Sequence, residues 1–193
     1  MKKKRFVVSG VSIFFLMCAP FYLNAEEMPK ETVTEAPAKS AEETLTEASG
    51  DIGKASLPDS SEYEGEFKNG KFHGKGRLVW RNGSRYSGEF NEGLMEGAGV
   101  YLEKDGAKYE GEFRGGLPHG RGVYSFSNGD VYEGDMRNGG PNGRGAISFS
   151  SGDKYEGEFK NGKFHGEGKY THVKDNGEIM EMDGYWEKGD FAG

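Results

Sequence analysis

A short pattern that returns at a fixed spacing constrains this chain more than any other feature. It consists of a tyrosine, any residue, a glycine, an acidic residue and an apolar residue. The leading tyrosines follow one another every 23 residues, at Tyr63, Tyr86, Tyr109, Tyr132 and Tyr155, and a partial sixth copy begins at Met182. A constant period of this size is typical of a solenoid or of an array of hairpins.

Alternation within each copy predicts strands. In residues 63–67 the two aromatic rings and the glycine share one face of a strand, and Glu64 and Glu66 share the other. A second strand is expected at 76–81 and at the equivalent positions 99–104, 122–127, 145–150 and 168–173. The pairs between repeats predict tight hairpin turns with positive φ at both residues, namely Asn82-Gly83, Asp105-Gly106, Asn128-Gly129, Ser151-Gly152 and Asn176-Gly177. We therefore predict an all-β fold, an elongated single-layer antiparallel sheet of stacked β-hairpin repeats over residues 62–193.

Composition agrees with short strands and excludes several classes of function. The chain has 33 Gly, 13 Phe, 10 Tyr and 2 Trp, and glycine with aromatics suits tight turns and strands better than a helical core. A single cysteine, Cys18, excludes a disulfide framework and a cysteine-based zinc site. A formal net charge of −7 argues against a nucleic-acid partner.

Residues 1–25 have the pattern of an export signal. Lys2 to Arg5 are basic, residues 6–23 are mostly apolar, and Ala25 precedes two glutamates, which predicts cleavage after Ala25. An uncleaved N-terminal membrane anchor is the alternative, because 18 apolar residues approach the length needed to span a bilayer. Lipid attachment at Cys18 is disfavoured because Met17 stands where a small residue is required. We expect an exported protein, periplasmic or at the cell surface.

Residues 26–61 are expected to form an acidic, disordered linker. They carry nine carboxylates against three lysines and almost no large apolar side chain. Such a segment cannot bury enough apolar surface to fold alone. The predicted organisation is therefore a signal peptide (1–25), a linker (26–61) and a repeat array (62–193).

The repeats resemble a known family. Residues 63–76 read Tyr-Glu-Gly-Glu-Phe-Lys-Asn-Gly-Lys-Phe-His-Gly-Lys-Gly and match residues 155–168 at 13 of 14 positions. This sequence resembles the MORN repeat (membrane occupation and recognition nexus), and the resemblance covers residues 63–189. Met136, Pro118, Pro141 and Met182 depart from the pattern. The resemblance implies a curved single-layer sheet that serves as a non-catalytic binding scaffold.

Three patterns that could carry chemistry have simpler explanations. His73, His119 and His165 recur at one repeat position, but equivalent residues should lie ~10 Å apart, too far to share a metal ion. Glu64 and Glu66 recur in other repeats, and a solvated row offers no single site in which two carboxyl pKa values separate. The Gly-x-Gly segments precede no helix that could bind phosphate. We predict no catalytic residue, cofactor or metal.

Aromatic side chains form the remaining candidate site. We expect them on one face of the sheet, where most hold neighbouring strands together. A single layer leaves this face uncovered, and contiguous exposed apolar surface marks an interface. The candidate interaction face comprises Tyr63, Phe67, Trp80, Tyr86, Phe90, Tyr109, Phe113, Tyr124, Phe126, Tyr132, Phe149, Tyr155, Phe159 and Trp186, and Leu78, Ile147 and Tyr170 should join it.

These observations favour a scaffold for protein–protein interaction or homodimer formation. Lipid headgroups are one alternative partner, although the array has 18 basic and 23 acidic residues and would be steered only weakly to anionic membranes. Lys71, Lys75, Arg77, Arg121, Arg144 and Lys163 are the cations that could gather locally. Cell-wall glycan is the other alternative, because sugars stack on aromatic rings.

Overall fold

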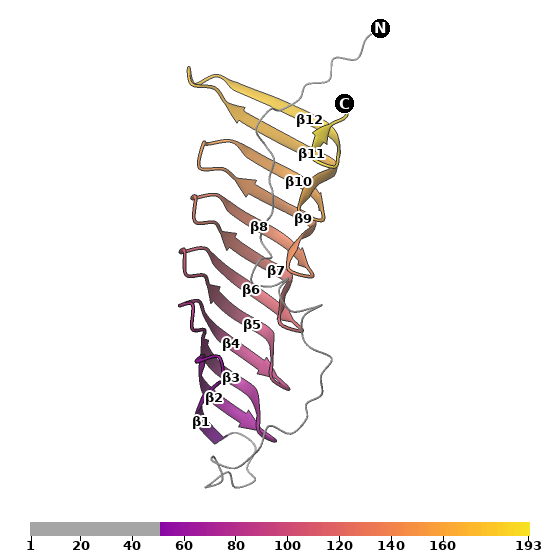
Figure 1. The fold of residues 1–193 in the computed structure, drawn as a ribbon. Coiled ribbons are helices and arrows are strands. Elements are labelled where there is room, and N and C mark those ends of the chain that lie inside the picture. The colour runs from indigo at the N-terminus through magenta and orange to yellow at the C-terminus, as the bar shows by residue number, and fades with distance from the viewer. Residues whose placement is uncertain (1–50) are drawn as a thin grey trace.

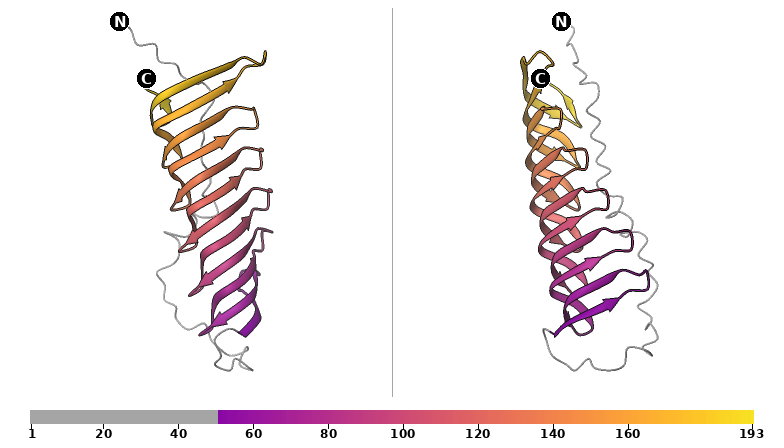
Figure 2. Two further views of the ribbon diagram at one scale, coloured as in Figure 1. Left: turned by 180° about the vertical axis from the view of Figure 1, so that it is seen from behind. Right: turned by 90° about the vertical axis from the view of Figure 1, so that its left-hand side faces the viewer.

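The computed structural model describes residues 51–193, which form one open antiparallel sheet of thirteen strands. Strand order in the sheet follows order in the chain, and none of the described residues is helical (Figure 1). The predicted all-β, single-layer sheet of hairpins is confirmed. Figure 2 shows the hairpins stacked as successive rungs of an elongated array. The strands are β1 (Asp51–Ser56), β2 (Glu62–Lys68), β3 (Lys71–Val79), β4 (Arg85–Asn91), β5 (Leu94–Leu102), β6 (Lys108–Arg114), β7 (Leu117–Ser125), β8 (Val131–Arg137), β9 (Gly140–Ser148), β10 (Lys154–Lys160), β11 (Lys163–Val173), β12 (Ile179–Glu187) and β13 (Asp190–Phe191).

A continuous line of paired glycines crosses the sheet and fixes its register. Gly53 faces Gly65, Gly65 faces Gly76, and the same pairing continues strand by strand to Gly168 and Gly184. Just beyond this line most hairpins contain a register shift, as between Gly65 and Glu66 in β2. The 23-residue period therefore corresponds to two strands with one glycine each on the central line.

The two edges of the array are built from different turns. At one edge, two-residue turns such as Asn69-Gly70 have positive φ at both positions, 51° and 72°. At the other edge, five-residue loops such as Trp80–Ser84 join consecutive repeats. There the Gly83 N–H donates to the Trp80 carbonyl and the Trp80 N–H to the Ser84 carbonyl, each at 2.9 Å.

The prediction of positive φ at both residues of the inter-repeat turns was wrong. Only the glycine of each pair has it, as Gly83 does with φ 92°. The hydrogen bonds describe a type I turn followed by a left-handed glycine, a three-residue hairpin connection. The backbone of Asn82 is not in the positive-φ region, and its side-chain Oδ1 accepts a hydrogen bond from the Ser84 N–H at 2.9 Å. The primed two-residue turns lie inside the repeats instead.

The array begins earlier than predicted. Within the expected linker, residues 51–56 form β1, which pairs with β2 from Asp51↔Phe67 to Ser56↔Glu62. The Leu57–Ser61 segment has the same hydrogen bonds as the Trp80–Ser84 loop, including a side-chain bond from the Ser61 N–H to Asp59 at 2.9 Å. Asp51 to Ser61 is thus the second half of a degenerate repeat. The rest of the predicted linker and the whole predicted signal segment lie outside the described residues.

The fifth repeat accommodates its extra residues in longer strands rather than in a longer loop. β11 has 11 residues and β12 has 9, whereas β9 and β10 have 9 and 7. The Lys174–Glu178 loop, which joins β11 to β12, keeps the hydrogen-bond pattern of the loops in the shorter hairpins. The predicted partial sixth copy is present as the short hairpin β12–β13.

Candidate interaction surface

Most of the predicted aromatic face is buried within the sheet itself. Ten of the fourteen candidate residues have at most 4% of their surface exposed, namely Tyr63, Tyr86, Phe90, Tyr109, Phe113, Tyr124, Tyr132, Tyr155, Phe159 and Trp186. Leu78, Ile147 and Tyr170 join them in the same cluster, as expected. Phe67, Trp80, Phe126 and Phe149 are only partly buried against it. The expectation that the whole face is open to solvent is therefore corrected: four rings of the set remain accessible.

The tyrosines bury themselves by lying across the glycine line. A Cβ built on Gly122 would come within 2.6 Å of Cζ of Tyr109, so the ring occupies the space that a side chain would fill. The Tyr109 hydroxyl donates to the Glu112 carbonyl at 3.0 Å. The same bond recurs from Tyr63, Tyr86, Tyr132 and Tyr155. Burial raises the pKa of the Tyr155 hydroxyl to about 12, so these phenols stay neutral at physiological pH.

Rings stack between repeats as well as within them. Tyr63 stacks on Phe72 at 3.8 Å between centroids and meets Phe90 of the next repeat edge-on at 5.1 Å. Tyr86 likewise meets Phe113, and Tyr155 meets Trp186. Such edge-on pairs contribute beyond their buried area. A single layer can therefore bury its own core because each large ring covers the backbone and the ring of its neighbour.

The accessible rings lie at the loop edge. Trp80, Phe126 and Phe149 occupy one repeat position, the first residue of the five-residue loops, and each is partly exposed. Trp80 packs edge-on against Tyr101 at 5.5 Å, and Phe126 lies 4.5 Å from Tyr124. Their inner edges are thus fixed by the buried core while their outer edges face solvent.

Carboxylates at the same edge are held by the buried tyrosines. The Tyr124 hydroxyl donates to Glu103 at 2.7 Å, and burial raises the pKa of Glu103 in spite of this bond. The Tyr170 hydroxyl donates to Asp153 at 2.6 Å, and His172 Nδ1 lies 2.9 Å from the same carboxylate. Burial acts to raise the pKa of Asp153, but its hydrogen bonds outweigh burial and hold the pKa below its usual value.

The acidic residue that follows the first glycine of each repeat has a role that the sequence analysis missed. Glu66 accepts the Lys75 N–H at 2.9 Å, and Asp135 accepts the Arg144 N–H at 3.0 Å. Each carboxylate also lies beside a glycine with positive φ, Gly74 or Gly143. These carboxylates anchor the backbone beside the register shift, whereas Glu64 is exposed and pairs with Lys54 at 3.2 Å. The 23-residue recurrence was the available signal, because it argues for a structural role.

The histidines and glycines show no catalytic arrangement. His73, His119 and His165 face Glu66, Glu112 and Glu158 across their hairpins, and their carbonyls lie 3.3–3.4 Å from the tyrosine hydroxyls. Within residues 51–193, no group of three or more His, Cys, Asp or Glu side chains is placed to hold a metal ion. In the same residues no helix is long and apolar enough to cross a bilayer.

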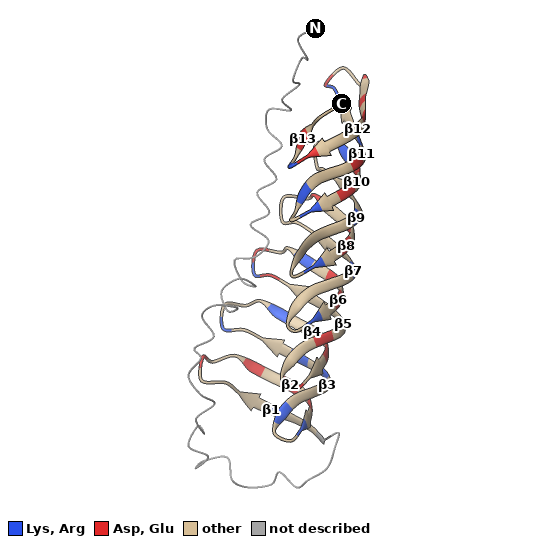
Figure 3. Ribbon diagram, turned by 90° about the vertical axis from the view of Figure 1, so that its right-hand side faces the viewer, with Lys and Arg blue, Asp and Glu red and all other residues tan. Residues whose placement is uncertain are grey.

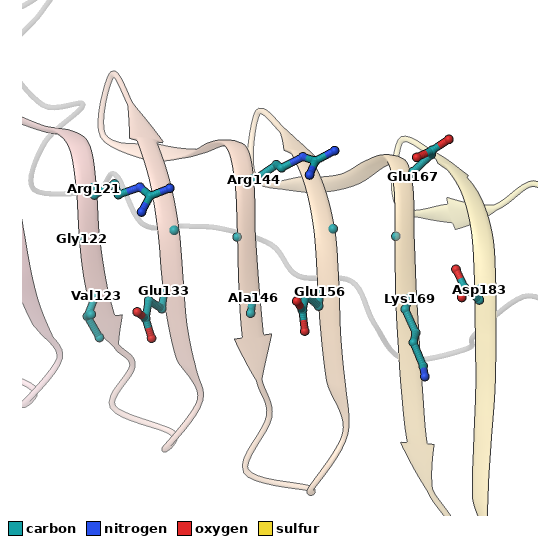
Figure 4. Close-up of a pocket in the computed structure, with 14 residues that line it drawn as sticks. Arg121, Gly122, Val123, Glu133, Arg144, Ala146, Glu156, Glu167, Lys169 and Asp183 are labelled. Atoms are coloured by element: carbon teal, nitrogen blue, oxygen red, sulfur yellow. The ribbon is translucent and has the colours of Figure 1, made fainter.

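A polar groove of about 850 Å³ runs across the outer face from β7 to β12, opposite the tyrosines. Its floor is the glycine line, from Gly122 to Gly168. Arg121, Arg144 and Glu167 lie on one side of this floor, and Val123, Glu133, Ala146, Glu156, Lys169 and Asp183 lie on the other (Figure 4). Both signs of charge therefore border the groove. Of the cations expected to gather, only Arg121 and Arg144 share this groove.

The repeat boundaries identify the family. MORN repeats match residues 63–85, 86–108, 109–131, 132–154 and 155–176 without a gap. The chain belongs to the MORN repeat family. Each match begins at the tyrosine that crosses the glycine line and ends in the five-residue loop or just after it. A MORN repeat here is therefore one β-hairpin and the loop that leads to the next, and the family is a non-catalytic one.

Comparisons with individual proteins add little to the family assignment. No curated protein matches this MORN array in sequence. One similar solved structure is the TCP domain of SAS-4 (dCPAP) from Drosophila melanogaster, in complex with a proline-rich motif of Ana2 (dSTIL). The two chains are 10% identical with a TM-score of 0.39, over 67% of this chain and 70% of that one.

Proposed function

We propose that this MORN array is an exported, non-enzymatic scaffold that binds a protein partner or a second copy of itself in the bacterial envelope. The row formed by Trp80, Phe126 and Phe149 carries this proposal. Aromatic rings that are fixed on one side and accessible on the other serve well as anchors in protein interfaces, because binding orders few additional torsions. The row extends over four consecutive loops, with Glu103 in place of a ring between Trp80 and Phe126, and so suits an extended partner.

The open ends of the sheet also favour a protein partner. β1 has no further strand beside it within the described residues, and Ile52 on this strand is 80% exposed. At the other end, β13 pairs only with Trp186 and Glu187 of β12. Ile179, at the beginning of β12, is 65% exposed. Unpaired strand edges with apolar side chains are suited to strand addition by another chain.

Export rests on the sequence alone. The basic start, the apolar stretch of residues 6–23 and Ala25 support a cleaved signal, with an N-terminal anchor as the alternative. Either form would place the array outside the cytoplasm. Labelling of the intact cell surface and of a periplasmic extract with an antibody to the array tests this address, and a purely cytoplasmic signal would contradict it.

A photo-crosslinking amino acid in place of Phe149 tests the interaction face, with the same substitution at Glu133 on the outer face as the matched control. Expression in the native cell should give a defined protein adduct from position 149 and none from position 133. A doubled chain mass would identify self-association, and light scattering across a dilution series should then show a dimer. Equal adducts from both positions would contradict the proposal.

The outer groove supports glycan binding as a second candidate. The floor of this groove is backbone without projecting side chains, because residues on the glycine line face the tyrosines, so a flat ligand can approach it. Walls of mixed charge offer both donors and acceptors to hydroxyl groups. The same mixture disfavours anionic headgroups, because Glu133 and Glu156 would repel them. Co-sedimentation with purified cell wall should be weakened by E133A/E156A if this candidate is correct, and flotation with anionic vesicles should show no binding.

A further inference from the structure

The two edges of the array carry opposite charge. The tight-turn edge, defined as residues 68–71, 91–94, 114–117, 137–140, 160–163 and 187–190, holds seven cations and three carboxylates. The loop edge, defined as residues 57–61, 80–84, 103–107, 126–130, 149–153 and 174–178, holds three cations and seven carboxylates. An acidic protein thus presents one basic edge. Figure 3 views the sheet from the tight-turn edge, where basic residues recur from turn to turn.

Most cations of the tight-turn edge are free to bind an external anion. Lys71 pairs with Glu92 at 2.9 Å, and Lys188 lies 4.0 Å from Glu187. Within the described residues, no ion pair involves the other five, which are all exposed: Lys68, Arg114, Arg137, Lys160 and Lys163. Successive turns are separated by two strands, or ~10 Å, so the edge is a ladder of ~50 Å with a cation on most steps.

The acidic N-terminal segment enters the sheet at this edge. Asp51, the first residue of β1, pairs with Phe67, and Lys68 follows directly at the turn. Residues 26–50 carry seven glutamates against two lysines, a net charge of −5. Twenty-five residues can extend over ~80 Å, which exceeds the length of the ladder. The segment is therefore joined to the array beside the basic edge, has the complementary charge and is long enough to follow it.

We propose that residues 26–50 bind along the tight-turn edge of the same molecule, as a tethered acidic ligand of the cation ladder. The tether gives the segment an effective concentration of ~1 mM or more at its own edge, which a free acidic partner must exceed. The segment thereby shields the edge from other anions, including acidic proteins and anionic membranes. It leaves the aromatic row on the opposite edge accessible.

Paramagnetic NMR on residues 26–193 tests this directly. This chain contains every residue of the described core and lacks Cys18, so a single S40C substitution carries a nitroxide label. At ~0.01 M salt the Debye length is ~30 Å, so the attraction between the acidic segment and the basic edge is hardly screened. The nitroxide should then lie close to the tight-turn edge, and the amide signals of Gly115, Gly139 and Gly162 should lose about half of their intensity or more. The loop glycines Gly106, Gly129 and Gly152 should be little affected. At ~1 M salt the difference should vanish.

Matched charge variants separate this interaction from chance proximity. R114Q/R137Q/K160Q should abolish the broadening, whereas R81Q/K104Q/K174Q, which removes three cations from the loop edge, should leave it unchanged. Equal broadening at both edges, or no response to the first variant, would overturn the proposal. So would broadening of unlabelled chains by labelled ones, which would mean binding between copies. Broadening only by spin-labelled phosphatidylglycerol vesicles would make the edge a membrane surface instead.

Discussion

The ring of Tyr109 lies where a side chain on Gly122 would have to be. This contact joins two neighbouring strands, and it recurs as Tyr63 on Gly76, Tyr86 on Gly99, Tyr132 on Gly145 and Tyr155 on Gly168. It explains why a single-layer sheet can have a core. Tyr109 covers a bare backbone and is itself contacted edge-on by the ring of Phe113, 5.1 Å away between centroids.

Gly122→Ala should therefore destabilise the array. The added methyl group meets the ring and hydroxyl of Tyr109, and overpacking of this kind costs about 1–3 kcal/mol. Gly140→Ala is the matched control, because a Cβ there meets nothing within 4 Å and its φ is not in the left-handed region. Urea unfolding followed by tryptophan fluorescence measures both. If the two variants unfold at the same urea concentration, the ring does not occupy the site as described.

The tyrosine hydroxyl makes a separate contribution. Tyr109→Phe removes the donor to the Glu112 carbonyl and leaves the ring in place, so the free energy of unfolding should fall by about 0.5–1.5 kcal/mol. Tyr185→Phe provides the comparison, since Tyr185 is 49% exposed and its change should cost less than about 0.5 kcal/mol. Thermal unfolding by circular dichroism distinguishes them. A Tyr109→Phe variant as stable as the parent would show that water replaces this bond without loss.

Period and alternation were sufficient to predict the sheet, its hairpins and the face that the rings share, because both follow directly from strand geometry. The same reasoning could not predict burial. Whether Tyr63 is exposed depends on the ring turning onto Gly76, a side-chain torsion that alternation does not specify. Likewise β1 was missed because Gly53 and Asp59 retain the spacing of a repeat, while Ala55 and Leu57 stand where most other repeats have aromatic side chains. Asn82-Gly83 was misassigned because the dipeptide alone does not distinguish a two-residue turn from a three-residue connection.

Asp153 should make stability depend on acid pH. Its carboxylate accepts bonds from Tyr170, the Val173 N–H and His172, and these hold its pKa below its usual value in the fold. A lowered folded pKa contributes stability above the unfolded pKa of about 3.9, and that contribution disappears as pH falls through the folded value. Asp153→Asn should therefore cost about 1.5–3 kcal/mol at neutral pH.

The difference between the parent and Asp153→Asn should shrink steadily below about pH 4, where the parent carboxylate also becomes neutral. Asp175→Asn, at an exposed position in the Lys174–Glu178 loop, is the matched control, and at neutral pH its free energy of unfolding should differ from that of the parent by less than about 0.5 kcal/mol. Urea unfolding of the three proteins across this pH range provides the measurement. A constant difference between parent and Asp153→Asn would mean that the carboxylate acts through shape rather than charge.

The glycine line predicts that whole repeats can be removed but fractions of a repeat cannot. Deleting residues 109–131 brings β5 beside β8 with Gly99 facing Gly134 and Tyr101 facing Tyr132, the pairing that β5 now makes with Gly111 and Tyr109. Because each repeat contacts mainly its neighbours, the shortened array should fold cooperatively. The slope of its unfolding free energy against urea concentration should decrease, because less surface is exposed on unfolding. Its free energy of unfolding should decrease as well.

Deleting residues 110–131 instead leaves one additional residue between the same strands. A one-residue offset moves every following side chain to the opposite face, so Tyr132 would have to point away from the core or the strand would have to bulge. This variant should unfold at a clearly lower urea concentration than the 23-residue deletion, although it retains more of the chain. Equal midpoints for the two deletions, measured by circular dichroism on the same preparations, would show that paired glycines do not set the register.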